Sequence, residues 1–281
     1  MSKDLNVSKR HSQMGTAHVL YMKTKTQSQN ITPKRGIGNT PTLALSRVAW
    51  ISASGKPKSE PAGKALLDRE LYLARASRVG NRYPGQSNYH GLKYFSNTGT
   101  QLWHESLMER RFLLTLDFTD DVVAIAAQPM KMDFADGSSH FPDFIALHAD
   151  QRQVVYNVKP ASLIKPKVQI QFDNAAALCL KVGWTHAVVS SFEPAVIANI
   201  EWLANFRNAI FRTSPKALDQ LFTALAEPAS VADAAASMTD AALNSAIPAI
   251  YHLAWQGELR LDLSRPLSNA TLVRKAFHAH S

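Results

Sequence analysis

The segment from His140 to Pro160 carries three side chains whose types suit phosphodiester chemistry, namely Asp143, Asn157 and Lys159. The alternation of side chains along a strand places Asn157 and Lys159 on one face. An antiparallel strand that ends near Asp143 can bring its carboxylate beside them. Carboxylate and amide oxygens are ligands that Mg²⁺ accepts, and a nearby amine can neutralise developing charge or orient water. These residues therefore predict metal-dependent phosphodiester hydrolysis.

A second carboxylate must come from outside these two strands. An expected helix precedes them, and Glu105 and Glu109 stand four residues apart on one of its faces. Either glutamate could supply the second carboxylate of a metal site. The alternative for each is a structural position on a solvent-facing side of the helix.

The elements expected around these residues form an α/β arrangement. Pro166 and Gly183 mark the two ends of one helix, and β-branched apolar residues over 185–191 predict a strand. The full order is a helix over 102–116, strands near 122–128 and 130–134 or one bent strand, strands over 140–148 and 153–159, a helix over 166–181, a strand over 185–191 and a helix over 194–211. This order predicts a mixed sheet flanked by helices.

A small C-terminal domain is expected after the turn signal at 213–215. Three short helical patterns over 216–226, 230–237 and 240–255 precede an alternating strand over 258–263. This is the pattern of a winged-helix module. The segment holds Lys216 and Arg260 against six acids, so docking to a protein partner is favoured over insertion into a DNA groove. We expect its removal to abolish partner association and to leave the α/β domain folded.

The positive charge of the chain is concentrated at its N-terminal end. The formal net charge is +9, with 16 Lys and Arg against 4 Asp and Glu in residues 1–100, and 15 against 18 in residues 101–281. Residues 1–58 lack long periodicity and are interpreted as a flexible basic arm that could lie along phosphates. A solvated tail, or a start codon assigned too early, is the alternative. A helix from Glu60 to Arg78 and a Gly- and Pro-rich loop over 79–101 would follow.

Composition bounds the class of protein. With 281 residues and 46% hydrophobic residues the chain can bury two modest cores, and its single cysteine, Cys179, excludes an internal disulfide or a cysteine-based zinc site. No apolar run reaches the length of a membrane span, and the N-terminus lacks a secretory pattern. We expect a soluble cytoplasmic protein without a membrane partner.

A longer pattern of residues resembles a known family. It runs from Glu105 to Glu109, through 116–118 and 122–129, to the Pro-Asp pair ending at Asp143 and the Lys159-Pro160 pair. This pattern resembles TnsA, the endonuclease subunit of heteromeric transposases, within the PD-(D/E)xK nuclease superfamily, over roughly residues 80–195. The resemblance implies a restriction-endonuclease-like α/β fold followed by a winged-helix-like domain.

The resemblance also implies the site and its cofactor. Carried over, Glu109, Asp143, Asn157 and Lys159 form the catalytic set, with the first three holding Mg²⁺, for which Mn²⁺ would substitute. The family commonly has Gln or Glu where this chain has Asn157, which puts the second metal position in doubt.

The implied function is cleavage at the 5′ ends of a transposon. A TnsB-like transposase subunit would cut and join the 3′ ends, and a TnsC-like ATPase would bind the C-terminal domain. A free-standing restriction or repair nuclease and a non-catalytic DNA-binding assembly subunit are the alternatives. The implied division is an arm over 1–58, a lead-in over 59–100, a nuclease domain over 101–212, a winged-helix-like domain over 213–268 and a tail over 269–281.

Four further residues are candidate DNA contacts. Lys165 and Lys167 stand at an expected helix start, and His140 lies near Asp143. Gln128 precedes Pro129 at a strand exit. The structural alternatives are a solvated helix face for the lysines, a hydrogen bond for His140 and the shaping of the strand exit for Gln128.

Overall fold

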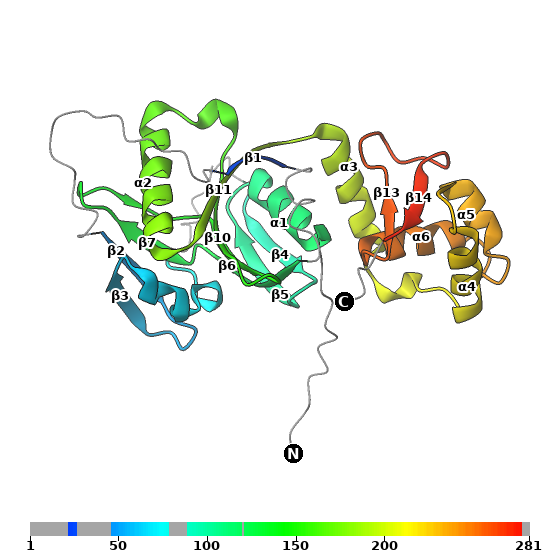
Figure 1. Ribbon diagram of the computed structural model, residues 1–281, viewed down its shortest axis with the longest axis horizontal. Coiled ribbons are helices and arrows are strands. Elements are labelled where there is room, and N and C mark those ends of the chain that lie inside the picture. The colour runs from blue at the N-terminus through cyan, green and yellow to red at the C-terminus, as the bar shows by residue number, and fades with distance from the viewer. Residues whose placement is uncertain (1–21, 27–45, 79–88, 120, 277–281) are drawn as a thin grey trace, which may run out of the picture.

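The computed structural model describes residues 22–26, 46–78, 89–119 and 121–276. Over these residues the protein has a mixed α/β architecture, as expected from the sequence. An α/β domain and a C-terminal domain lie side by side (Figure 1).

A five-stranded mixed sheet forms the centre of the α/β domain. Strands β10 and β11 pair in parallel, and the other neighbouring strands are antiparallel. In spatial order the strands are β1 (Met22–Thr26), β11 (Thr185–Phe192), β10 (Gln153–Val158), β9 (Phe144–His148) and β6 (Val122–Ala127). The strands predicted near 122–128 and 153–159 are confirmed, whereas the one predicted over 140–148 is divided.

Helices α1 (Leu107–Thr119) and α2 (Pro166–Val182) cover opposite faces of this sheet (Figure 1). Phe112 of α1 packs in one core with Tyr156 of β10, and Leu178 of α2 packs in a second core with Val155. Tyr156 and Val155 are neighbours on β10 but pack in different cores, because successive side chains of a strand point to opposite faces of the sheet. Helix α2 ends where Gly183 adopts a φ of 102°, as predicted.

A second sheet lies beside α2 and corrects the expectation of a flexible arm over 1–58. Its strands, in spatial order, are β3 (Pro57–Pro61), β2 (Arg47–Ile51), β7 (Met130–Asp133) and β8 (Ser139–His140). Val48 and Trp50 alternate into the core that holds α2, which explains why this segment folds. Strand β1 also lies within the supposed arm, and residues 1–21 and 27–45 of the arm lie outside the described ones.

The lead-in over 59–100 also differs from expectation. In place of one helix from Glu60 to Arg78 there are two 3₁₀ turns, η2 (Lys64–Arg69) and η3 (Leu71–Leu73), separated by Glu70 at a φ of 49°. The expected loop contains a hairpin of β4 (Gly91–Phe95) and β5 (Thr100–His104), so α1 begins at Leu107 and not at 102. Phe95 and Leu102 of the hairpin are buried against α1, which a local pattern does not reveal.

The C-terminal domain contains three helices and a small three-stranded antiparallel sheet in the order β12-β14-β13. The elements after α3 (Pro194–Leu203), η5 (Ala204–Phe206) and η6 (Ala209–Phe211) are α4 (Pro215–Ala224), β12 (Ala229–Ser230), α5 (Val231–Ser237), α6 (Ala246–Trp255), β13 (Leu259–Leu261) and β14 (Leu272–Lys275). Strand β14 lies within the supposed tail over 269–281. That prediction is wrong for 272–275, because Val273 is fully buried and pairs with both neighbouring strands.

An apolar layer joins the two domains. Leu114 of α1 and Ile200 of α3 belong to one buried cluster with Trp255 of α6. Beside it, Asn199 donates from Nδ2 to the carbonyl oxygen of Leu263 at 3.0 Å. Removing residues from 213 onward would expose this layer to solvent. The expectation that the α/β domain stays folded without them stays a prediction.

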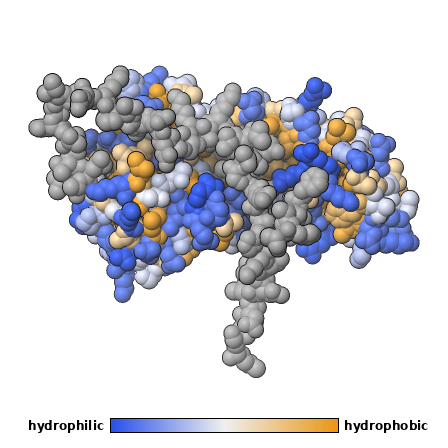
Figure 2. Space-filling model, in the orientation of Figure 1, coloured by the Kyte–Doolittle hydropathy of each residue, from blue (hydrophilic) through white to orange (hydrophobic). Residues whose placement is uncertain are grey.

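Hydrophobic and hydrophilic residues are interspersed on the face shown in Figure 2. Among the residues that the structure describes, no helix combines the length and the apolar character needed to cross a bilayer.

Candidate active site

A cavity of about 840 Å³ lies where α1, β10 and α2 approach one another. It is lined by all four predicted catalytic residues, Glu109, Asp143, Asn157 and Lys159, and also by His140. Residues up to 50 positions apart in the sequence thus meet in one place.

Asp143 is held by the ends of the two strands that flank β9. Its N–H donates to the carbonyl oxygen of Tyr156 at 3.1 Å, and its own carbonyl oxygen accepts from the N–H of Gln128 at 2.7 Å. Its side-chain Oδ2 accepts from the N–H of Val158 at 2.7 Å. The carboxylate therefore has one oxygen fixed by the backbone, in a residue held on both sides by main-chain bonds.

The charge state of Asp143 reflects its acidic surroundings. Burial, followed by the negative charge of Glu109, raises the pKa of Asp143 to about 8, against smaller opposing effects of the Val158 N–H and of Lys159. Asp143 is therefore mostly protonated at neutral pH while no cation is bound. A carboxyl group whose pKa is raised by a neighbouring carboxylate is expected where two acids lie close together.

Glu109 has a structural role in addition to its position in the cavity. Its Oε1 accepts from the Ser106 hydroxyl at 2.8 Å and its Oε2 from the Glu105 N–H at 2.7 Å, while the Glu109 N–H donates to Ser106 Oγ at 3.2 Å. These contacts form a reciprocal cap at the start of α1, similar to a capping box. Burial raises the pKa of Glu109 above its ordinary value, and these hydrogen bonds oppose that shift.

Asn157 lies between two histidines. Its Nδ2 donates to His140 Nε2 at 2.8 Å, and its Oδ1 accepts from His186 Nε2 at 2.9 Å. Burial lowers the pKa of His140, and burial followed by the charge of His140 lowers the pKa of His186 to about 4, so both rings are neutral at pH 7. The predicted metal-binding oxygen is thus engaged by His186, with one lone pair left for a cation.

Lys159 follows the last residue of β10 and faces the same cavity. Its N–H donates to the carbonyl oxygen of Val189 on β11 at 3.0 Å, which continues the strand pairing to this position. Its positive charge lowers the pKa values of both Asp143 and His140. The amine is therefore close enough to act electrostatically on the carboxylate.

The remaining predicted DNA contacts differ in their placement. Lys165 and Lys167 are exposed at the start of α2, which leaves them available to a phosphate. Gln128 is only 4% exposed and has a φ of 45°. Because the side chain is buried, nothing in the structure supports the DNA contact predicted at Gln128, which stays a prediction. The residue shapes the corner that holds Asp143.

Sequence reasoning missed the arginines of the cavity. Arg78 reaches it from the lead-in, where its Nη2 lies 2.7 Å from Glu105 Oε2. Arg111 also lines it and pairs with Glu201, with Nε to Oε1 at 3.0 Å. The sequence carried no signal for Arg78, because it lies about 30 residues before the acids and outside any recognisable motif.

The carboxyl groups that line the cavity suit a hard cation that takes few ligands from the protein. Among the described residues, no three His, Cys, Asp or Glu side chains converge to enclose a metal ion. Mg²⁺ commonly takes one or two carboxylates and keeps several waters, which Glu109 and Asp143 could satisfy. A further observation fits a cation here, because Oε1 of Glu105 is a buried oxygen in the cavity wall without a hydrogen-bond partner.

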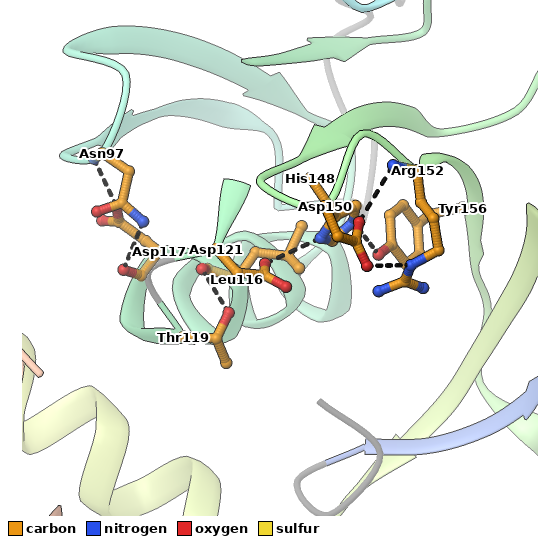
Figure 3. A network of polar contacts seen from close by, with 9 residues as sticks. All are labelled: Asn97, Leu116, Asp117, Thr119, Asp121, His148, Asp150, Arg152 and Tyr156. Carbon is orange, nitrogen blue, oxygen red and sulfur yellow. Dashed lines mark hydrogen bonds and ion pairs between the residues drawn. The ribbon is translucent and has the colours of Figure 1, made fainter. Parts of the chain in front are cut away.

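A separate polar network lies at the other end of β10 (Figure 3). His148 Nδ1 is 2.9 Å from Asp121 Oδ1, and His148 Nε2 is 2.8 Å from the hydroxyl of Tyr156. This acid–histidine–hydroxyl order is found in nucleophilic enzymes. Here all three side chains are buried and burial raises the pKa of Tyr156, so the network is structural.

Comparison with known proteins gives no family assignment. No protein-family model matches the sequence, and no curated protein gives a significant match.

Proposed function

We propose that the protein is the Mg²⁺-dependent DNA endonuclease subunit of a heteromeric, TnsA-like transposase. The observation that carries the proposal is that Glu109, Asp143, Asn157 and Lys159, from three separate elements, line one cavity. Two buried carboxyl groups, both with raised pKa values, beside an amine suit a divalent cation and a phosphodiester.

The arrangement of elements supports a restriction-endonuclease-like fold. In chain order α1, β6, β9, β10, α2 and β11 build a mixed sheet with one helix on each face. The Pro-Asp pair directly precedes β9, and Asn157 lies on the neighbouring antiparallel strand β10. This is the setting in which the PD-(D/E)xK pattern would bring its residues together.

The C-terminal domain supports the winged-helix part of the proposal. Its order is helix, strand, helix, helix, strand, strand, and the first strand pairs with the last. This order is that of winged-helix modules. With five Lys and Arg against six Asp and Glu over 213–276, the domain lacks the strong positive charge that favours DNA. We propose that its partner is a TnsC-like ATPase, with a TnsB-like transposase subunit completing the complex.

The residues of the cavity would divide the chemistry as follows. Glu109 and Asp143 would hold the cation, and Asn157 could add its remaining lone pair. When bound, Mg²⁺ would polarise the scissile phosphate and favour ionisation of water. Lys159 would place its ammonium beside the phosphate and offset charge that develops there. Asp143 would release its proton on binding, since its pKa of about 8 leaves it mostly neutral at pH 7.

The proposal is tested by cleavage of DNA that carries the ends of the element, with Mg²⁺ or Mn²⁺ and with the partner proteins. Asp143→Ala and Lys159→Ala should each lose at least about 100-fold in rate while DNA binding is retained. Asp133→Ala and Lys131→Ala, from an exposed ion pair on β7, are the matched controls and should cleave normally. Equal cleavage by the wild type and both cavity variants would refute the site. Efficient cleavage of arbitrary duplex without partners would favour a free-standing nuclease.

One observation favours a second candidate, a DNA-binding assembly subunit without catalysis. Asn157 is engaged by two histidines, and Glu109 caps its own helix. Both contacts would persist if the cavity no longer bound a cation. Absence of cleavage by the wild type, with assembly of the complex intact, would support this candidate.

A further inference from the structure

Arg78 is held over the acidic side of the cavity by two contacts. Its Nη2 lies 2.7 Å from Glu105 Oε2, and its guanidinium carbon lies 5.7 Å from the centre of the Phe141 ring. Phe141 stands two residues before Asp143, so the guanidinium is held close to the proposed site. The side chain remains 52% exposed, and a ligand can therefore reach it.

The backbone before Arg78 is anchored to the same corner as Asp143. The N–H of Ser77 donates to the carbonyl oxygen of Gln128 at 2.8 Å, and its hydroxyl donates to that of Pro129 at 3.0 Å. The N–H of Gln128 in turn donates to the carbonyl oxygen of Asp143 at 2.7 Å. The backbone of Gln128, which lies in the left-handed region, is therefore hydrogen-bonded both to Ser77, next to Arg78, and to Asp143.

This placement is more than an exposed ion pair requires. Exposed arginine–carboxylate pairs contribute little to stability, and a pair alone does not need an anchored backbone and an aromatic support. The cavity wall carries the carboxyl groups of Glu105 and Glu109, whose negative charge would repel a polyanion. A guanidinium suits such a place, because its planar fork matches the oxygens of a phosphate.

We propose that Arg78 binds a backbone phosphate of DNA at this cavity, and that it exchanges Glu105 for the phosphate when DNA arrives. The inference rests on the proposed nuclease function and adds a substrate contact to it. Arg78 lies before the stretch that resembles the transposase family, so the contact comes from the structure and not from that resemblance.

The first test measures duplex DNA binding by the full-length protein in EDTA, over a series of NaCl concentrations, by fluorescence anisotropy. Arg78→Gln should weaken binding about tenfold and reduce the slope of log affinity against log salt by about one, since one phosphate contact is lost. Arg69→Gln, which breaks an exposed arginine pair with Glu60, is the matched control and should change neither quantity. Thermal unfolding of each variant confirms that it is folded.

The second test separates a phosphate contact from a merely structural partner of Glu105. If Arg78 binds phosphate, Glu105→Gln frees it and should tighten DNA binding, opposite in sign to Arg78→Gln. This gain should disappear in the double variant. If the gain persists when Arg78 is absent, it comes only from removing a negative charge, and the proposal is overturned.

Other outcomes distinguish this inference from the proposed function. Wild-type affinity and salt slope in Arg78→Gln would overturn the inference even if the wild type cleaves DNA. Arg78-dependent binding of duplex by a protein that cleaves with neither Mg²⁺ nor Mn²⁺, even with its partners, would uphold the inference and refute the nuclease. A wild type that does not bind duplex DNA would overturn both.

Discussion

The N–H of Val158 donates to Oδ2 of Asp143 at 2.7 Å, across the ends of β10 and β9. A carboxyl group in this position is oriented by the main chain and does not depend on a neighbouring side chain. Asp143 is nevertheless mostly neutral at pH 7, since burial and Glu109 outweigh this hydrogen bond. The orientation of this carboxyl group is thus fixed by the backbone, while its charge depends on the pH.

The pH dependence of stability should reveal the acidic site. The pKa of Asp143 rises from 3.8 to about 8 on folding. Its contribution to stability is therefore fully present below pH 3.8 and is lost as the pH rises to about 8. Asp143→Asn has no carboxyl group to ionise, so it does not lose this stability at high pH. In EDTA its melting temperature should therefore exceed that of the wild type by about 2–4 °C or more at pH 8.5 and by less at pH 5. A difference that does not vary with pH would contradict the assignment, and Asp133→Asn serves as the control.

Cation binding should release a proton. Because Asp143 is mostly protonated at pH 7, binding of Mg²⁺ or Mn²⁺ should release nearly one proton per ion. Calorimetric titrations in two buffers of different ionisation enthalpy measure this number. Asp143→Asn should bind more weakly and release no proton. Tight binding without proton release in the wild type would place the cation elsewhere.

The histidine pair around Asn157 should destabilise the fold in acid. The pKa of His186 is lowered to about 4, so its contribution is present above pH 6.5 and is lost as the pH falls toward 4. His186→Gln can still donate to Asn157 and should reduce this acid sensitivity. His186→Leu leaves the Asn157 oxygen without this donor and should cost about 1–3 kcal/mol at pH 7. Urea unfolding at pH 5 and pH 7 distinguishes the two variants, and equal losses in both would argue against the hydrogen bond.

The buried network on the far end of β10 should affect stability. Tyr156→Phe removes the hydrogen bond to His148 and should lower the free energy of unfolding by about 1–3 kcal/mol. Tyr94→Phe, at an exposed position of β4, should change it by less than about 0.5 kcal/mol. Chemical denaturation of the two variants provides the comparison, and similar values would show that the network contributes nothing.

The sequence predicted the elements whose local pattern and burial agree. Helix α2 begins at Pro166 and ends before Gly183, and β11 has an apolar centre of Ala-Val-Val, so both were found nearly to the residue. The convergence of Asp143 and Lys159 followed from strand alternation and antiparallel pairing. These elements needed no knowledge of distant contacts.

The elements that were missed depend on partners far along the chain. Strand β2 is ordered by pairing with β7, about 80 residues later, and its Ser- and Lys-rich surroundings were typical of an arm. Likewise, the surroundings of Asn157 arise because His140 and His186 approach it from two other strands. Contacts between distant segments do not produce a periodic pattern within either segment, so the local sequence does not predict them.

Helix α1 belongs to two parts of the molecule at once. Glu109 at its first turn lines the cavity, while Leu114, little more than one turn further on, is buried in the apolar layer shared with α6. Both residues belong to one continuous helix of 13 residues, so a shift of the whole helix moves them together. A displacement of α1 at the apolar layer would therefore also move Glu109 and the acidic wall of the cavity.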